Sequence, residues 1–142
     1  MVSKKEYKEY SECHYRMAKK YHQKGIHESD DLKKLTYLSA AVSFLLVSTD
    51  HLLNWMLYPN MFKSRTARYS FFRSYRKLTK GLSGKTRSCV VTYPFTILGL
   101  RNRLWYLSDQ ESIPNAVNDL TIKEINKLFK EADYVRNIIE KI

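Results

Sequence analysis

Residues 31–58 read DLKKLTYLSAAVSFLLVSTDHLLNWMLY, and their apolar side chains recur at spacings of three and four residues. This spacing places them on one side of an α-helix. Because the stripe covers more than half of the helix circumference, we expect this helix to contact two or more others. Ser29, Asp30 or Asp31 can cap its start, and Pro59 ends it. The sequence therefore predicts a core helix whose stripe consists of Leu35, Leu38, Val42, Leu45, Leu46, Thr49, Leu52, Leu53 and Met56.

Two amphipathic helices are predicted near the ends of the chain. Residues 4–24 form the first, with Gly25 as a natural C-cap. The last begins near Asp119 or Thr121 and continues to residue 142, and Thr121 and Glu124 form a capping box at its start. Their apolar faces consist of Tyr7, Tyr10, His14, Met17, Ala18 and Tyr21 in the first helix, and of Leu120, Ile122, Ile125, Leu128, Phe129, Ala132, Val135, Ile138 and Ile139 in the last.

The middle of the chain is less regular. Residues 60–80 form a basic segment with helical spacing, and the stretch GLSGKTR at residues 81–87 is predicted as a flexible loop. Residues 88–93 have strand propensity, which leaves their state open. Pro94 suits the first turn of a helix that ends near residue 107. Residues 109–114 form the loop before the last helix.

The composition favours an all-α protein. The chain has 142 residues with only 4 Gly and 3 Pro, so it has few positions for turns between long elements. Its length is that of one domain with one hydrophobic core. We therefore expect a single domain over residues 1–142, folded as an up-down bundle of about five helices.

Three features indicate a soluble, cytoplasmic protein. Residues 1–10 are charged and lack the apolar region of a signal peptide. The most apolar run, residues 38–49, is too short to span a bilayer, so no membrane partner is expected. Cys13 and Cys89 belong to no motif, which favours a reducing compartment.

The net charge of the protein comes from one segment. No Asp or Glu occurs between His51 and Ser108. Of the 25 Lys and Arg residues, 11 lie in this segment, and the remaining 14 equal the 14 acidic residues in number, so the segment supplies the whole formal charge of +11. Such a concentration of positive charge indicates a polyanionic partner, and nucleic acid is the partner that we expect first. The candidate binding residues are Lys63, Arg65, Arg68, Arg73, Arg76, Lys77, Lys80, Lys85, Arg87, Arg101 and Arg103.

Aromatic residues are interleaved with these cations. Arg grips phosphate with a planar fork and aromatic rings stack on unpaired bases, so the mixture suits RNA or single-stranded nucleic acid. The alternative is that the rings form the core side of a basic helix. Gly84, Lys85 and Thr86 match the end of a phosphate-binding P-loop, but Thr79 stands where its first glycine belongs. The aromatic residues are Tyr58, Phe62, Tyr69, Phe71, Phe72 and Tyr75.

The C-terminal third resembles the HEPN superfamily (higher eukaryotes and prokaryotes nucleotide-binding). The stretch LGLRNRLWYL at residues 98–107 is followed by a loop and the amphipathic helix TIKEINKLFKEADYVRNIIEKI. Arg101 and Asn102 match the Arg-Asn pair that the family carries on a late helix. The long apolar helix over residues 31–58 is similar to the family's central helix. The resemblance implies an all-α scaffold that is dimeric and associated with RNA.

One catalytic residue of the family is missing. HEPN ribonucleases carry a His five to seven positions after the motif Arg, and the two residues act from both protomers on an RNA 2′-hydroxyl and phosphate. Here those positions hold Tyr106, Leu107 and Ser108, and no His follows His51. The resemblance therefore implies a member without the imidazole that moves the proton.

Two further sets of residues are of types used in catalysis or metal binding. Arg16 and His22 have an Arg-x5-His spacing on the first helix, which makes them a second candidate for a catalytic pair. Cys13, His14, His22 and His27 lack the paired spacing of a zinc site, and we expect neither metal nor cofactor. Trp55 and Trp105 are interpreted as core or interface anchors.

These observations favour a non-enzymatic, HEPN-like protein that binds RNA or single-stranded nucleic acid through its central basic segment. A ribonucleoprotein, anti-phage or toxin–antitoxin assembly is the expected setting, as a homodimer or larger complex, and the composition is typical of an AT-rich prokaryotic or phage genome. One alternative is a metal-independent HEPN-type endoribonuclease with a diverged site. The other is a basic module that binds an acidic protein partner.

Overall fold

The computed structural model describes residues 2–59, 76, 79–105 and 112–142, and these residues form helices and no strands. The all-α class predicted from the sequence is confirmed, with four long helices in the described ranges. The helix expected over residues 60–80 lies almost wholly outside them. The elements are α1 (Lys4–His27), α2 (Asp31–Leu57), the 3-10 turn η1 (Thr79–Gly81), α4 (Gly84–Trp105), the short α5 (Ile113–Ala116) and α6 (Asp119–Lys141).

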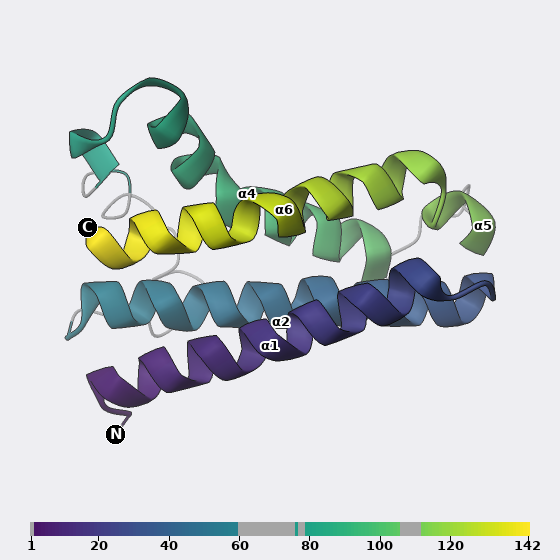
Figure 1. Cartoon of the computed structure of the whole chain (residues 1–142), viewed down its shortest axis with the longest axis horizontal. Coiled ribbons are helices and arrows are strands. Elements are labelled where there is room, and N and C mark those ends of the chain that lie inside the picture. The colour runs from purple at the N-terminus through teal and green to yellow at the C-terminus, as the bar shows by residue number, and fades with distance from the viewer. Residues whose placement is uncertain (1, 60–75, 77–78, 106–111) are drawn as a thin grey trace.

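The helices form a bundle with α2 at its centre (Figure 1). α1 runs antiparallel to α2 along its full length, and α4 and α6 lie on the opposite side of α2. α2 contacts α1, α4, α5 and α6, as its wide apolar stripe predicted. α4, whose N-terminal half is basic, therefore packs directly on the core helix α2.

The predicted stripe of α2 is the core of the protein. Leu38, Val42, Leu45, Leu52 and Leu53 are all completely buried, and of the nine predicted residues only Met56 is half-buried. By length and composition alone, α2 qualifies as a membrane-spanning helix, but half of its most apolar window is buried inside the bundle. That burial is typical of the core helix of a soluble protein.

The ends of α2 follow the sequence signals. The Asp30 carboxylate accepts a hydrogen bond of 2.9 Å from the backbone N–H of Lys33, which caps the helix start. Tyr58 forms the C-cap immediately before Pro59. Of the three residues predicted as possible caps, Asp30 fills the position, because its side chain stands three residues before a free helical N–H.

The predicted end of α1 was wrong. α1 continues through Gly25 to His27, and Glu28 is its C-cap. Gly25 lies against α2, where a Cβ would stand 2.6 Å from Cδ2 of Leu38, a side chain with no solvent exposure. This glycine therefore serves close helix packing, and not chain reversal.

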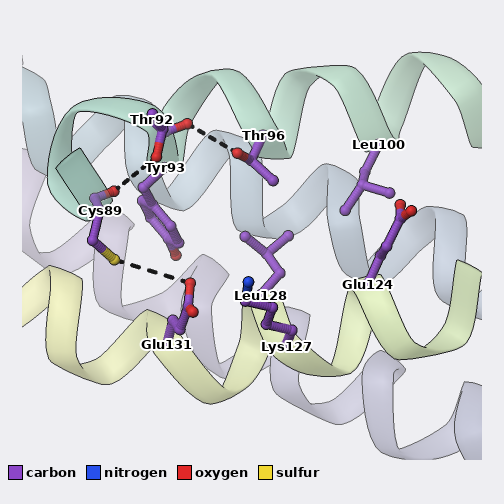
Figure 2. A pocket seen from close by; sticks show the side chains of 9 residues that line it. All are labelled: Cys89, Thr92, Tyr93, Thr96, Leu100, Glu124, Lys127, Leu128 and Glu131. Atoms are coloured by element: carbon purple, nitrogen blue, oxygen red, sulfur yellow. Dashed lines mark hydrogen bonds between the residues drawn. The ribbon is translucent and has the colours of Figure 1, made fainter. Parts of the chain in front are cut away.

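The predicted loop over residues 81–87 and the open assignment of residues 88–93 are corrected in the same way. α4 begins at Gly84 and continues through residue 93, so Pro94 lies inside the helix and not at its start. Val90, Tyr93, Ile97, Leu100 and Leu104 are buried at helical spacing, and the Tyr93 side chain points toward α6 (Figure 2). Burial of this face outweighs the local strand propensity and the hydrogen bond lost at Pro94.

The start of α6 lies at Asp119, the earlier of the two predicted positions, but its cap is different. The Asn118 side chain accepts a hydrogen bond of 2.9 Å from the backbone N–H of Thr121. Thr121 is buried inside the first turn, and Glu124 binds another helix instead of closing a capping box.

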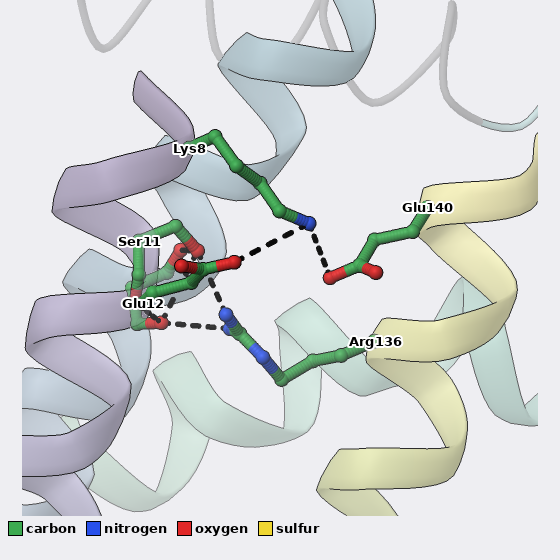
Figure 3. A network of polar contacts seen from close by, with 6 residues as sticks. Lys8, Ser11, Glu12, Arg136 and Glu140 are labelled. Atoms are coloured by element: carbon green, nitrogen blue, oxygen red, sulfur yellow. Dashed lines mark hydrogen bonds and ion pairs between the residues drawn. The ribbon is translucent and has the colours of Figure 1, made fainter. Parts of the chain in front are cut away.

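A buried arginine joins three helices (Figure 3). Arg136 of α6 is 4% exposed, and its guanidinium donates hydrogen bonds to the hydroxyls of Ser48 in α2 at 2.7 Å and Ser11 in α1 at 2.9 Å. Each serine hydroxyl in turn donates to the backbone carbonyl of the other, at 2.8 and 2.6 Å. The guanidinium also lies 4.2 Å from the ring centroid of Tyr15.

The rim of this network is ionic. Lys8 pairs with Glu140 across α1 and α6 and lies 3.9 Å from Glu12 on its own helix. The Tyr15 hydroxyl donates a 2.6 Å hydrogen bond to Asp133. Since Arg136 is buried and remains charged, these carboxylates supply the negative charge near it.

We predict that Arg136→Ala lowers the free energy of unfolding by about 3 kcal/mol, because two hydrogen bonds from a charged donor are lost and a cavity remains. Urea denaturation followed by circular dichroism measures the change. Arg16→Ala, at an exposed position of α1, is the matched control, with an expected change within about 0.5 kcal/mol. Equal stability of the two variants would contradict this role of Arg136.

Two glycines provide a second test of the packing. Gly25→Ala should destabilise the protein by about 1–3 kcal/mol, because the new methyl group meets Leu38. Gly99→Ala, in α4 with no atom within 4 Å of the new Cβ, should stabilise it by about 0.5–1 kcal/mol through helix propensity. Thermal unfolding of both variants gives the two signs, and a Gly25→Ala protein as stable as the wild type would show that the α1–α2 approach is not tight at Gly25.

Candidate nucleic-acid interface

Six of the eleven predicted binding residues lie within the described ranges. Five are exposed and Arg101 is half-buried. The other five, Lys63, Arg65, Arg68, Arg73 and Lys77, lie outside the described residues. The six are Arg76, Lys80, Lys85, Arg87, Arg101 and Arg103.

Arg76 and Arg87 line one open pocket of about 450 Å³ at the start of α4. Its remaining lining residues are neutral, and none of the ion pairs within the described ranges involves either arginine. Among the described residues, the lining of the pocket thus contains two arginines and no carboxylate. Its other lining residues are Gly84, Ser88, Val91 and Thr92.

The first turn of α4 adds to this positive charge. Gly84 has a φ of +54°, a conformation that glycine adopts without strain. The turn contains no acidic residue and carries Lys85 and Arg87. A helix N-terminus already has a partial positive charge from its free N–H groups. Cations at this end repel that charge, and a bound anion such as phosphate relieves the repulsion.

The side of α4 that faces α6 is different, because its arginine is neutralised. One guanidinium nitrogen of Arg103 donates to Glu124 at 3.0 Å and to Thr121 at 3.2 Å. This ion pair joins α4 to α6 across the surface. Arg103 thus has a carboxylate partner within the fold, and its predicted role in binding stays a prediction.

A second pocket between α4 and α6 carries carboxylates (Figure 2). It has a volume of about 260 Å³ and includes Glu124, Glu131 and Lys127. The Cys89 thiol lies 4.0 Å from a Glu131 oxygen, and burial together with that carboxylate raises the pKa of Cys89. With two carboxylates and one ammonium group, this pocket is unsuited to a polyanion. Of these two pockets, the one lined by Arg76 and Arg87 is therefore the one whose described lining suits a polyanion.

Arg101, the motif arginine of the HEPN resemblance, packs on its own helix. Its guanidinium lies 4.7 Å from the ring centroid of Trp105, one turn further along α4. Trp105 is 52% exposed, so it is not the core residue that the sequence interpretation allowed, whereas Trp55 is half-buried. Asn102 is exposed at the next position, about 100° around the helix from Arg101.

Arg16 and His22 do not form a pair. Six helical positions place them on faces about 120° apart. Arg16 is exposed, whereas His22 is 8% exposed and its Nε2 lies 2.7 Å from Oδ1 of Asn126 in α6. The His22 ring stacks on Phe129 with centroids 4.2 Å apart, and burial lowers the pKa of His22. His22 thus lines a groove between α1 and α6, away from Arg16.

Sequence reasoning missed a ladder of aromatic rings along the seam of α1 and α2. The centroids of His14 and His51 lie 5.4 Å apart, and Phe44 and Tyr7 lie 6.0 Å from His14 and His51 respectively. Tyr21 stacks on Phe44 at 5.6 Å. The signal was present as a seven-residue repeat, at residues 7, 14 and 21 of one helix and at residues 37, 44, 51 and 58 of the other.

Burial lowers the pKa of His51, and the neighbouring His14 lowers it further. The Nδ1 atom of His51 is buried with no hydrogen-bond partner among the described residues. Protonation of the ring would place a positive charge at a partly buried site where this nitrogen has no hydrogen-bond acceptor among the described residues.

This arrangement predicts acid sensitivity. Because the folded protein binds the His51 proton less readily than the unfolded chain, stability is complete above the unfolded pKa of about 6.5 and falls as the pH decreases below it. The urea midpoint of the wild type should therefore decrease from pH 7.5 to pH 5.5. His51→Phe should reduce that decrease, whereas His27→Phe, at an exposed position, should leave it unchanged. Identical pH profiles for all three proteins would argue against the His51 assignment.

Within the described residues, no group of three or more His, Cys, Asp or Glu side chains is placed to hold a metal ion. Comparison of this chain with known protein families, with curated proteins and with solved structures finds no match. Membership of the HEPN superfamily therefore stays a hypothesis, and functional inference depends on the placement of charge in the fold.

Proposed function

We propose that this chain is a non-enzymatic, cytoplasmic protein that binds RNA or single-stranded nucleic acid through the carboxylate-free flank of α4. The observation that carries the proposal is the pocket shared by Arg76 and Arg87. Two guanidinium groups from residues eleven positions apart converge there, next to the positive end of a helix. Phosphate groups of a nucleic acid match that charge and geometry.

The rest of the chain supports a polyanion over an acidic small molecule. No Asp or Glu occurs from residue 51 to residue 108, so the basic segment extends well beyond a single pocket. In the described part of that segment, Arg103 is the arginine that forms an ion pair within the protein, with Glu124. A long acid-free segment fits a ligand with a repeating negative charge.

A HEPN-like scaffold without nuclease activity is consistent with the positions of the histidines. All four belong to α1 and α2, and none lies on α4 beside Arg101. In this proposal Arg101 binds RNA together with Trp105 and transfers no proton. A homodimer, or a subunit of a ribonucleoprotein, anti-phage or toxin–antitoxin assembly, is the setting that we propose.

Charge reversal in the pocket provides the test. The double variant Arg76→Glu/Arg87→Glu should weaken binding of a fluorescent single-stranded RNA about 30-fold, since each lost charged contact contributes about 1 kcal/mol or more. Fluorescence anisotropy at 50 and 200 mM salt should also show a shallower salt dependence for this variant, because fewer counterions are released.

The matched control is Arg16→Glu/Lys20→Glu, which makes the same change in net charge at two exposed positions of α1. It should retain most of the wild-type affinity. An equal loss in both double variants would mean that binding follows net charge alone and has no site on α4. Binding that ignores salt, or purification with a stoichiometric acidic protein and no nucleic acid, would favour the protein-partner alternative instead.

A further inference from the structure

Trp105 is exposed in a way that packing does not explain. Its side chain is at the end of the described part of α4 and is 52% exposed, whereas tryptophan in folded proteins is highly buried on average. The other tryptophan, Trp55, is half-buried and covered by the ammonium groups of Lys8 and Lys4, which lie 4.7 and 5.4 Å from its ring centroid. Trp55 is thus used within the fold, and Trp105 offers its indole to solvent.

Arg101 holds this indole in a defined position. The two residues are one helical turn apart, and the guanidinium lies 4.7 Å from the ring centroid. The contact is a cation–π pair, so the two planar groups orient each other before any ligand binds. Indole and guanidinium planes are the groups on which proteins stack unpaired bases.

In a regular helix, the spacing of Arg87 and Trp105 would place the platform and the arginine pocket on one side of α4. Arg87 and Trp105 are 18 residues apart, with Pro94 between them, and 18 residues of a regular helix correspond to about five turns and a rise of about 27 Å. Val91 and Leu98 lie between them at helical spacing, are both half-buried, and carry no charge. A stacked strand that rises about 3.4 Å per nucleotide along its axis would need roughly eight nucleotides to span that distance.

We infer that Arg101 and Trp105 form a stacking platform for an unpaired base, and that one single strand crosses this flank of α4 between the platform and the Arg76–Arg87 pocket. The inference rests on the proposed function and makes it more specific. A duplex keeps its bases stacked inside, where the indole cannot reach them, so the flank selects single strands. The pocket then contributes salt-dependent affinity, and the platform contributes the preference for unpaired bases.

The platform is tested by the fluorescence of Trp105. In the variant Trp55→Phe, Trp105 is the single tryptophan and reports on the platform directly. Titration with a 12-nucleotide oligouridine should quench this fluorescence, and the midpoint should equal the dissociation constant from anisotropy. A 12-base-pair RNA duplex should bind without comparable quenching.

Affinity provides an independent readout in the wild-type background. Trp105→Ala should weaken oligouridine binding roughly tenfold, the usual loss for one stacked base, and leave duplex binding unchanged. Its salt dependence should equal that of the wild type, because no phosphate contact is removed. Trp105→Phe should retain part of the affinity, since a smaller ring still stacks. Because Trp105 is exposed, both variants should unfold at the wild-type temperature.

The outcomes separate the two proposals. Salt-dependent binding of oligouridine with no quenching and no loss in Trp105→Ala would overturn the platform and leave the arginine pocket as the site. An equal loss of duplex and single-strand binding in Trp105→Ala would also overturn it, since the preference for unpaired bases would then have another source. Absence of binding to either nucleic acid would overturn the proposed function and the platform together.

Discussion

The buried guanidinium of Arg136 is the constraint on which the arrangement of the helices depends. It has five N–H donors and cannot lose its charge, so the fold must supply acceptors inside the bundle. Ser11 and Ser48 do so from two different helices, and each of these hydroxyls also binds the backbone carbonyl of the other. These bonds form only when α1, α2 and α6 stand at one relative height. The small serine side chains also let α1 and α2 approach closely enough to make them.

The position of α4 follows from that frame and gives the helix two unlike flanks. Its buried face packs on α2, which leaves the side toward α6 and the opposite side to carry charge. Toward α6, Arg103 is paired with Glu124 and the adjoining pocket contains a second carboxylate. On the opposite side, Arg76, Arg87 and Arg101 have no carboxylate partner among the described residues. One helix thereby separates a surface used for folding from a surface available to a ligand.

The sequence predicted those elements whose burial is periodic, and it failed where tertiary contacts decide. The stripe of α2 and the face of α6 were readable because every third or fourth residue is apolar. Residues 88–93 were not, because Val90 and Tyr93 favour a strand locally and become helical only by packing on α2 and α6. Charge counting located the basic segment but could not show that Arg103 meets Glu124, 21 residues away. The exposure of Trp105 was equally invisible, because apolar residues are buried by default.

The ring ladder between α1 and α2 repeats itself, and this has a consequence for how the chain finds its native alignment. Both helices present rings every seven residues, so sliding one past the other by about 10 Å would again set ring against ring. The ring contacts alone therefore do not distinguish the native alignment from one shifted by seven residues. The serine pair does not follow this repeat, because no serine stands seven residues before or after Ser11 or Ser48. Arg136 can therefore bind both serines in a single alignment. The hydrogen bonds of Arg136 thus select one alignment of α1 and α2 among several that the aromatic rings would allow.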